Sequence, residues 1–527
     1  MKHRGFFSTV IWTAGMLALP LAASAAQSAG TGPETGPAIH SDVSRPLRDV
    51  VSAPRDHTPK LHPNRRVPLP AQPEQADAAL QTAVGPTIAS TGGLRYPGVG
   101  AGDYGFNPNS APPDPNLSVG STQVVQIVNE SFAVFDKATG AIAAGFPKTN
   151  KTLWSGFGGG CEANNDGDAI VQYDKAANRW VITQFSVTTT PYLQCVAVST
   201  TSDATGSYNR YAFSYGTTQF NDYAKLSVWP SAYFITFNIF TNGSTFAGAK
   251  ACAYDRASML NGAPATQQCF QLSTSYGGLL PSDLDGTIAP PAGSPAYFVN
   301  FGTNSLNLWR FRVDWATPAN TTFTGPASIP VAAFTSACGG GACIPQPGTS
   351  QKLDSLADRL MYRLAYRRFA DGHEAMVVNH SVKVSGTKRA EVDGIRWYEI
   401  RSPGTTPTIF QQGTFSPDAT NRWMGSIAMD KLGNIAVGYS ASSGSVYPSL
   451  RFTGRVPSDP LGTLQNENVI LPGGGSQLTN LSRWGDYSAL AVDPSDDCTF
   501  FYTNEYLKTN GTFNWSTEIA SFKLPGC

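Results

Sequence analysis

A recurring strand-turn-strand pattern constrains the fold of this chain more than any other feature. Its clearest copy spans residues 171–185, where an apolar strand leads into the turn Asp-Lys-Ala-Ala-Asn and a second strand rich in β-branched and aromatic residues. Two later copies start with Arg-Trp, at Arg422 and at Arg483, and repeat the order of short apolar strand, tight turn and second strand. Short strands separated by turn residues predict an all-β protein.

Seven copies of the pattern can be placed along the chain, 54 to 75 residues apart. They start near Asp114, Asp168, Asp222, Asp283, Asp358, Arg422 and Arg483. Radial arrays of four-stranded sheets repeat every ~40 to 50 residues, and long outer loops explain the greater spacing. We therefore predict a β-propeller with seven blades; six or eight blades, or an array of β-sandwiches, are the alternatives. Pairing between an N-terminal strand and the C-terminal strand would close the ring without a free edge.

The N-terminal end carries the features of an export signal. A basic start, Met1-Lys2-His3-Arg4, precedes an apolar run over residues 6–22, and the small residues Ala23-Ser24-Ala25 follow. This order predicts a signal peptide over residues 1–25 and a secreted or periplasmic protein. A membrane anchor is the alternative, but polar residues interrupt the run. No later stretch has the ~20 consecutive apolar residues of a spanning helix.

Residues 26–92 differ in composition from the rest of the chain. They are rich in Pro, Ala, Gly, Ser and Thr and contain few aromatic residues. Such a segment cannot bury enough apolar surface to fold alone, so we predict a disordered leader, with a pro-segment as a further interpretation. The propeller domain is then expected over residues 93–527.

Overall charge narrows the class of partner. The chain has 37 basic and 37 acidic residues, and only 14% of its residues are charged. A neutral, weakly charged chain lacks the electrostatic attraction that binds nucleic acid or an anionic membrane surface. We expect instead a monomer without a membrane span, whose partner is a glycan or an extracellular protein.

The eight cysteines all follow the predicted signal peptide and occur as near neighbours. An even number of cysteines in an exported chain predicts disulfides. A metal cluster is the alternative, but the chain has no Cys-x-x-Cys spacing. Pairing in sequence order is favoured because each bond then lies within one repeat: Cys161–Cys195, Cys252–Cys269, Cys338–Cys343 and Cys498–Cys527.

Acidic residues near the starts of the repeat copies, which we also call units, are candidate catalytic residues. In a propeller, equivalent positions of the repeats converge on one mouth of the central channel. A pair of carboxylates can run glycoside hydrolysis, with the distance between them deciding the outcome. Asp168, Asp222 and Asp285 are the candidates for such a pair. The alternative is that an aspartate before a strand caps a turn.

Basic residues recur at the same positions. Guanidinium groups bind carboxylates bidentately, so Arg359, Arg422 and Arg483 are candidates for holding an acidic sugar or another anion. Lys225 and Asp486 occupy related positions in their units and join the candidate ligand-binding set. The alternative is that each arginine is solvated or paired locally.

The three arginines resemble the arginine arrangement of the sialidase superfamily of propellers. The turns at 174–178 and 430–434 distantly resemble that superfamily's Asp-box turns, Ser/Thr-x-Asp-x-Gly-x-x-aromatic. They lack the Ser or Thr two positions before the Asp. The resemblance implies a propeller fold and, by analogy, a glycosidase. Tyr487, beside Asp486, is the best candidate for the family's tyrosine nucleophile, with packing on the inner strand as the alternative.

The turn Asn164-Asn165-Asp166-Gly167-Asp168 is rich in oxygen ligands. Calcium prefers such hard ligands, so Asp166 and Asp168 are candidate calcium ligands. The remaining spacing of an EF-hand loop is absent, and a plain Asx turn is the alternative. No other cofactor is predicted.

Two classes of function therefore stay open. One is a carbohydrate-active enzyme, of the sialidase-like glycoside hydrolase type. The other is a non-catalytic propeller that binds a glycan or an extracellular protein. A deep pocket that joins two carboxylates, or Tyr487 with a carboxylate, would favour catalysis, whereas exposed aromatic residues on the outer loops would favour binding.

Overall fold

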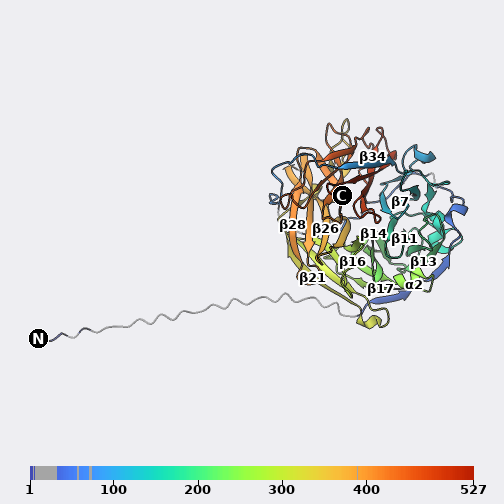
Figure 1. Cartoon of the computed structure of the whole chain (residues 1–527), viewed down its shortest axis with the longest axis horizontal. Coiled ribbons are helices and arrows are strands. Elements are labelled where there is room, and N and C mark those ends of the chain that lie inside the picture. The colour runs from blue at the N-terminus through green and yellow to red at the C-terminus, as the bar shows by residue number, and fades with distance from the viewer. Residues whose placement is uncertain (4, 6–31, 56–57, 71–73, 388–389) are drawn as a thin grey trace.

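The computed structural model describes residues 1–527 except residues 4, 6–31, 56–57, 71–73 and 388–389 (Figure 1). The expected signal peptide thus falls almost wholly outside the described residues, and its cleavage stays a prediction. No described helix is both long enough and apolar enough to cross a membrane. The helices that are described are short: α1 (Gly159–Ala163), α2 (Arg256–Leu260), and the 3-10 helices η1 (Leu47–Asp49), η2 (Asp103–Gly105), η3 (Asn150–Trp154), η4 (Pro318–Asn320) and η5 (Ala337–Gly340).

Strand pairing arranges most of the chain into four-stranded antiparallel units, here numbered in chain order. Unit 1 consists of β6 (Asn116–Val119), β7 (Gln123–Val128), β8 (Ser131–Asp136) and β9 (Lys148–Thr149). Unit 2 consists of β10 (Ile170–Asp174), β11 (Arg179–Ser186), β12 (Leu193–Ser199) and β13 (Tyr208–Ser214). Unit 3 consists of β14 (Gln219–Trp229), β15 (Ala232–Thr241), β16 (Thr245–Tyr254) and β17 (Thr266–Gln271). Unit 4 consists of β18 (Leu280–Asp285), β19 (Ala296–Gly302), β20 (Ser305–Arg312) and β21 (Thr322–Pro330).

The remaining units follow the same order. Unit 5 consists of β25 (Met361–Arg368), β26 (Glu374–Thr387), β27 (Ala390–Arg401) and β28 (Thr408–Phe415). Unit 6 consists of β29 (Asn421–Met429), β30 (Ile435–Ser442), β31 (Ser449–Arg455) and β32 (Asn468–Leu471). Unit 7 combines β33 (Ala489–Val492), β34 (Phe500–Leu507) and β35 (Trp515–Lys523) with the N-terminal strand β4 (Thr91–Pro97). Between units 4 and 5 lie the short strands β22 (Thr335–Ser336), β23 (Ala342–Ile344) and β24 (Leu353–Asp354).

The first strands of the units form a closed ring. They contact one another in the order β6, β10, β14, β18, β25, β29 and β33, and β33 contacts β6 again. The remaining strands of each unit extend outward from this ring in sequence order. Radial repetition of antiparallel sheets around a closed inner ring is the β-propeller architecture. The predicted fold class is therefore confirmed.

The ring closes by combining strands from both ends of the chain. In unit 7, β4 pairs antiparallel with β35, so that Tyr96 lies opposite Ile519. Pairing of this kind was considered from the sequence as one way to close the ring. It removes the free edge that the C-terminal strand would otherwise expose.

Neighbouring units pack face to face, which buries both faces of their middle strands. Along β15, Tyr233, Ile235 and Phe237 enter one apolar cluster, whereas Ala232 and Phe234 enter another. Successive side chains of a strand point to opposite faces, so a sheet covered on both sides needs apolar residues at consecutive positions. This explains the unbroken apolar run at the start of β15.

The leader is ordered against the outer edges of the propeller. The strands β1 (Glu34–Pro37) and β2 (His40–Val43) pair with β17 and β13, the outer strands of units 3 and 2. Further along, Leu80 forms a bridge with Thr414, and Thr87 forms one with Asn466. The prediction of disorder over residues 26–92 is therefore wrong for residues 34–37 and 40–43 and for Leu80 and Thr87. An extended segment that cannot fold alone can still complete the hydrogen bonds of exposed sheet edges.

Four disulfides join the cysteines in sequence order, as predicted. They are Cys161–Cys195, Cys252–Cys269, Cys338–Cys343 and Cys498–Cys527. Cys498–Cys527 fastens the C-terminus to the turn between β33 and β34, inside the unit that closes the ring.

Candidate functional site

Charged residues from five units meet at one end of the ring. The first strands run in the same direction, as the parallel register of β18 and β25 shows, so the starts of these strands share this end. We call it the first mouth. The following residues gather there: Asp114, Asp168, Asp222, Tyr223, Lys225, Arg359, Arg483, Asp486 and Tyr487.

The backbone bends sharply as it enters the first mouth. Asp114, Asp168 and Tyr223 have φ angles of 48°, 45° and 55°, in the left-handed region. Such a conformation costs a residue other than glycine of order 1 kcal/mol or more and tends to occur at functional sites. In unit 3 the bend coincides with a shift of the β14–β15 register between Asp222 and Lys225. The ladder is therefore interrupted where the candidate residues lie.

Asp168 and Asp222 occupy contrasting environments. Asp168 Oδ2 accepts a hydrogen bond from the Tyr223 amide over 3.1 Å and one from the Tyr487 hydroxyl over 3.4 Å. Burial and the nearby charge of Asp168 raise the pKa of Asp222 to about 7, although Arg65 and Arg359 oppose the shift. The pair thus combines a carboxylate that accepts hydrogen bonds with a carboxyl group that can hold a proton near neutral pH.

Lys225 is buried between two aromatic rings. Its Nζ atom lies 3.2 Å from the centre of the Tyr223 ring and 3.6 Å from that of Tyr487, and it donates to the Ala224 carbonyl over 2.9 Å. Burial lowers the pKa of Lys225 well below its usual value, although the charge of Asp168 opposes this. Burial and the charge of Asp168 also raise the pKa of Tyr487. Tyr487 therefore packs against Lys225 and also contacts the carboxylate of Asp168.

Two further acidic residues, Asp114 and Glu505, are buried next to these groups at the first mouth. Asp114 Oδ1 accepts from the Asp486 amide over 2.6 Å, and Asp114 Oδ2 accepts from Asn129 over 2.8 Å. Burial, together with the charges of Asp486 and Asp168, raises the pKa of Asp114 well above its usual value. Burial does the same for Glu505, which accepts from the Gly485 amide over 2.8 Å. The first mouth is therefore rich in carboxyl groups, and burial raises the pKa of Asp114 and Glu505 among them.

Arg359 and Arg483 are both paired within the first mouth. Arg359 forms two hydrogen bonds with Asp358, of 2.7 and 2.9 Å, and Arg483 forms one of 2.5 Å with Asp486. Burial opposes the charge of each arginine, but the neighbouring carboxylates outweigh it and raise the pKa of both groups.

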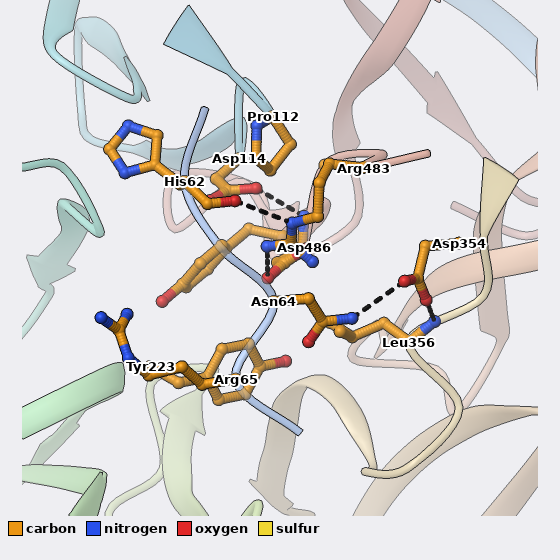
Figure 2. A network of polar contacts seen from close by, with 12 residues as sticks. His62, Asn64, Arg65, Pro112, Asp114, Tyr223, Asp354, Leu356, Arg483 and Asp486 are labelled. Atoms are coloured by element: carbon orange, nitrogen blue, oxygen red, sulfur yellow. Dashed lines mark hydrogen bonds and ion pairs between the residues drawn. The ribbon is translucent and has the colours of Figure 1, made fainter. Parts of the chain in front are cut away.

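The leader crosses this site. Arg483 Nε donates to the His62 carbonyl over 3.3 Å, and Arg359 Nη2 donates to the Arg65 carbonyl over 3.2 Å. Figure 2 shows the leader passing through the cluster, with His62 close to Arg483 and Asn64 directed at Asp354. The predicted leader and the predicted site are thus in direct contact.

Side chains of the leader also contact the aspartates of the first mouth. Arg65 Nη1 lies 3.6 Å from Asp222 Oδ1, and Asn64 Nδ2 donates to Asp354 Oδ2 over 2.9 Å. The Val67 amide donates to Asp358 over 3.0 Å. The cavity that remains among these residues measures only about 30 Å³.

Asp285 is not part of the first mouth. The sequence predicts that unit 4 starts near Asp283, but its first strand, β18, already begins at Leu280. Asp285 therefore lies at the other end of that strand, away from the first mouth. There it contacts Arg363 and binds Lys175 Nζ over 2.8 Å. Burial opposes its charge, but Arg363 and Lys175 outweigh burial and lower the pKa of Asp285 to about 2.

Arg422 is also separate from the other two arginines. Its guanidinium group is fully buried and binds Glu467 through two hydrogen bonds of 2.8 Å, with a third contact to Asp418 of 3.0 Å. The two copies of the repeat that start with Arg-Trp looked equivalent in sequence, but their arginines occupy different positions relative to the first strand. Arg422 lies inside strand β29, whereas Arg483 precedes strand β33 by six residues. Of the predicted trio, the first mouth brings together only Arg359 and Arg483.

Asp166 joins its turn to the residues that follow strand β11. Its carboxylate accepts hydrogen bonds from the amides of Val187 and Thr188, over 2.6 and 2.8 Å, and from the Thr188 hydroxyl over 2.5 Å. These partners lie 21 and 22 residues further along the chain, so the contacts are not those of the Asx turn considered as the alternative, in which the side chain bonds the backbone two residues on. Calcium binding by Asp166 and Asp168 stays a prediction.

The sequence interpretation missed several residues of the site. Glu505 was missed although it is a lone acidic residue in the apolar strand Phe500–Leu507, which is a signal of a buried carboxyl group. Asn64 and Arg65 were missed because a leader with few aromatic residues looked unstructured. Asp354 lies in the long insertion before unit 5, where the repeat pattern offers no guide.

Comparison with known proteins identified no family. No protein-family model matches the chain, and no curated protein matches it. Among solved structures, an α-L-arabinofuranosidase from Fusarium graminearum is 9% identical with a TM-score of 0.36, covering 84% of this chain and 98% of its own. A polysaccharide lyase described as an ulvan lyase is 11% identical with a TM-score of 0.35, covering 79% and 93%. A neuraminidase-like protein of subtype N10, of A/little yellow-shouldered bat/Guatemala/060/2010, is 9% identical with a TM-score of 0.34, covering 66% of this chain and 95% of its own. Similarity at this level does not establish a shared function.

Proposed function

We propose that this protein is an exported glycoside hydrolase whose catalytic groups lie at the first mouth. The observation that carries the proposal is the pair formed by Asp168 and Asp222. Asp222 would donate a proton to the leaving sugar oxygen, since burial and Asp168 raise its pKa to about 7. Asp168, which accepts hydrogen bonds from Tyr223 and Tyr487, would act as the second carboxylate.

The electrostatics of the site favour a neutral sugar. Arg359 and Arg483 are already paired with Asp358 and Asp486. Burial, and after it the negative charges of Asp486 and Asp168, raise the pKa of Asp114. An acidic ligand would meet repulsion from these carboxylates. We therefore propose a neutral glycan in preference to an acidic one.

Export supports this assignment. Four disulfides are typical of proteins that mature in an oxidising compartment, outside the cytoplasm. Extracellular and periplasmic glycans would then be available to the site. A monomeric state remains part of the proposal.

The leader must leave the first mouth before a glycan can enter. A double variant of the full chain, Asn64→Ala with Arg65→Ala, would remove its side-chain contacts with Asp354 and Asp222. We expect this variant to release reducing ends from at least one neutral polysaccharide in a panel that also contains acidic ones.

Substitution of the carboxyl groups in this background tests the mechanism. Asp222→Asn or Asp168→Asn should lower the rate by about 100-fold or more, as expected when a general acid or its partner is lost. Asp49→Asn, at an exposed position on η1, is the matched control and should keep the rate. Absence of hydrolysis across the panel by the double variant, or an unchanged rate in Asp222→Asn, would contradict the proposal.

A second candidate function follows from the leader itself. The first mouth holds an extended polypeptide through its backbone carbonyls at His62 and Arg65 and through the Arg65 side chain near Asp222. This contact favours a non-catalytic propeller that binds a basic extended peptide. Binding of a synthetic peptide with the sequence of residues 60–69 to the double variant, without any hydrolysis, would support this alternative.

A further inference from the structure

A larger cavity lies at the opposite end of the ring, at what we call the second mouth. It measures about 480 Å³, within the range of pockets that hold small ligands. Its walls come from the turns that end the first strands: those after β10, β14, β18 and β33. The catalytic proposal for the first mouth makes no use of this cavity, and the leader residues His62 to Val67 do not line it.

The walls of the cavity are apolar and rigidly held. Trp229, Pro230 and Leu284 contribute apolar surface. The Trp229 ring packs edge-on against Tyr366 at 4.8 Å between centres, and Tyr173 packs against Trp180 at 4.7 Å. Aromatic rings fixed in this way form a pocket before any ligand arrives, which reduces the entropy cost of binding.

Arg256 and Lys175, on the cavity wall, each have N–H groups that their ion pairs do not use. Arg256 uses Nε and Nη2 on Asp174, over 2.6 and 3.0 Å, so Nη1 is not part of this pair. Lys175 donates to the Leu284 carbonyl over 2.7 Å and to Asp285 over 2.8 Å, which uses two of its three N–H groups. Arginine and lysine have donors only, so a ligand must offer acceptors to them.

The carboxylates near the cavity are already occupied. Both oxygens of Asp174 accept from Arg256, and Tyr233 donates to Asp174 Oδ2 as well over 2.9 Å. Asp285 is held by Lys175 and Arg363. The ligand therefore meets donors at the polar side of the cavity and apolar surface elsewhere.

We propose that the second mouth binds a small ligand with an apolar body and an oxygen-acceptor end, such as a carboxylate or a sulfonate. The apolar body would lie against Trp229, Pro230 and Leu284. The acceptor end would meet Arg256 and Lys175. This is a ligand site independent of the first mouth.

The aromatic sulfonate 8-anilinonaphthalene-1-sulfonate has this chemistry and fluoresces when it leaves water. We expect saturable one-to-one binding of this probe to the folded full-length protein, measured by fluorescence and by calorimetry. Ala289→Trp would fill the cavity with a bulky ring at an exposed wall position and weaken binding by at least about tenfold. Ile288→Trp is the matched control, because Ile288 is exposed, adjacent in the chain and not part of the wall, and should bind as the parent does.

A second variant tests the polar side without disturbing a buried ion pair. Asn178 lies on the cavity wall with a φ of 54°, a conformation that glycine adopts freely. Asn178→Gly therefore removes the side-chain amide, together with the hydrogen bond that it accepts from the Tyr173 hydroxyl over 3.3 Å, without straining the backbone of the turn. Loss of one hydrogen bond should weaken binding by about three- to tenfold. Non-saturable probe binding, or equal binding by Ala289→Trp and Ile288→Trp, would overturn the proposal.

Discussion

Arg483 donates a hydrogen bond through Nε to the backbone carbonyl of His62 over 3.3 Å, although 421 residues separate the two in the chain. One partner belongs to the leader and the other to the first mouth of the propeller. The contact means that the leader has two roles. It covers sheet edges around the outside of the ring, and it occupies the end at which the candidate carboxylates meet.

Loosening the leader should expose the first mouth. Asn64→Ala with Arg65→Ala removes the leader's side-chain contacts to Asp354 and Asp222, and we expect a loss of about 1–3 kcal/mol in unfolding free energy. Hydrogen exchange and proteolysis should both increase within residues 60–69. Arg48→Ala is the control, because Arg48 also lies in the leader but forms an exposed ion pair with Asp203. Unchanged protection of residues 60–69 in the double variant would show that the leader is held by other contacts.

Stability should depend on pH through Asp222. Its pKa in the folded protein is raised to about 7 by burial and by Asp168, whereas the unfolded chain has an ordinary value near 3.8. Between these values the folded state holds a proton that the unfolded state has lost, so the contribution of Asp222 to stability is fully present below the lower pKa and falls as the pH rises towards 7. The full effect of this group is no more than about 4 kcal/mol.

Asp222→Asn removes that titration. Urea unfolding between pH 4.5 and 7.5 should show a shallower fall in stability for this variant than for the parent. Glu518→Gln is a useful comparison, because burial also raises the pKa of Glu518 to about 7, away from the first mouth. Parallel pH profiles for the parent and Asp222→Asn would mean that Asp222 is ionised in the folded protein.

The disulfide Cys498–Cys527 should matter more for stability than Cys338–Cys343. The first spans 29 residues and the second only 5, and a longer loop removes more entropy from the unfolded chain. Replacing both cysteines by alanine should cost about 3–4 kcal/mol for Cys498–Cys527 and about 2 kcal/mol for Cys338–Cys343. Chemical denaturation of the two double variants under non-reducing conditions makes the comparison. Equal losses would point to strain or to structure in the unfolded chain.

Arg422 should be needed for stability and not for binding at the first mouth. Arg422→Met leaves Glu467 buried with its remaining partners Arg451 and Tyr439, and breaking a buried pair of this kind costs about 3 kcal/mol. Thermal and chemical unfolding would measure the loss. The control is Arg312→Ala, at an exposed position where the guanidinium group donates to the Gly293 carbonyl. A change in glycan or peptide affinity at the first mouth, without a loss of stability, would reverse this assignment.

The repeat pattern was sufficient to predict the propeller because its cause is local. Each unit buries both faces of its middle strands, so runs such as that of β15 must be apolar at consecutive positions, and turn residues must separate them. The four disulfides could be paired in sequence order for a related reason, since close cysteines tend to share one supersecondary element. The closure by β4 also follows from a general property, the cost of an unpaired sheet edge.

The candidate site could be predicted only in part, because its residues depend on strand register. Asp168, Asp222 and Tyr487 were placed correctly at one end of the ring, as their unit starts were identified well. Asp285 and Arg422 were misplaced because β18 and β29 begin earlier relative to these residues than the repeat suggested. A shift of a few residues moves a side chain from one mouth to the other, or from the channel into the sheet.

The sequence alone therefore determined the class of fold, the disulfide pairs and most of the carboxylates at the first mouth. These follow from periodicity and from short distances along the chain. Only the tertiary structure decided that the leader fills the first mouth, that Arg422 is absent from it, and that the turn at 174–178 lines the cavity of the second mouth. The first fact depends on contacts between residues hundreds of positions apart, such as His62 and Arg483. The other two depend on where each strand begins and ends, and so on which end of the ring its side chains reach.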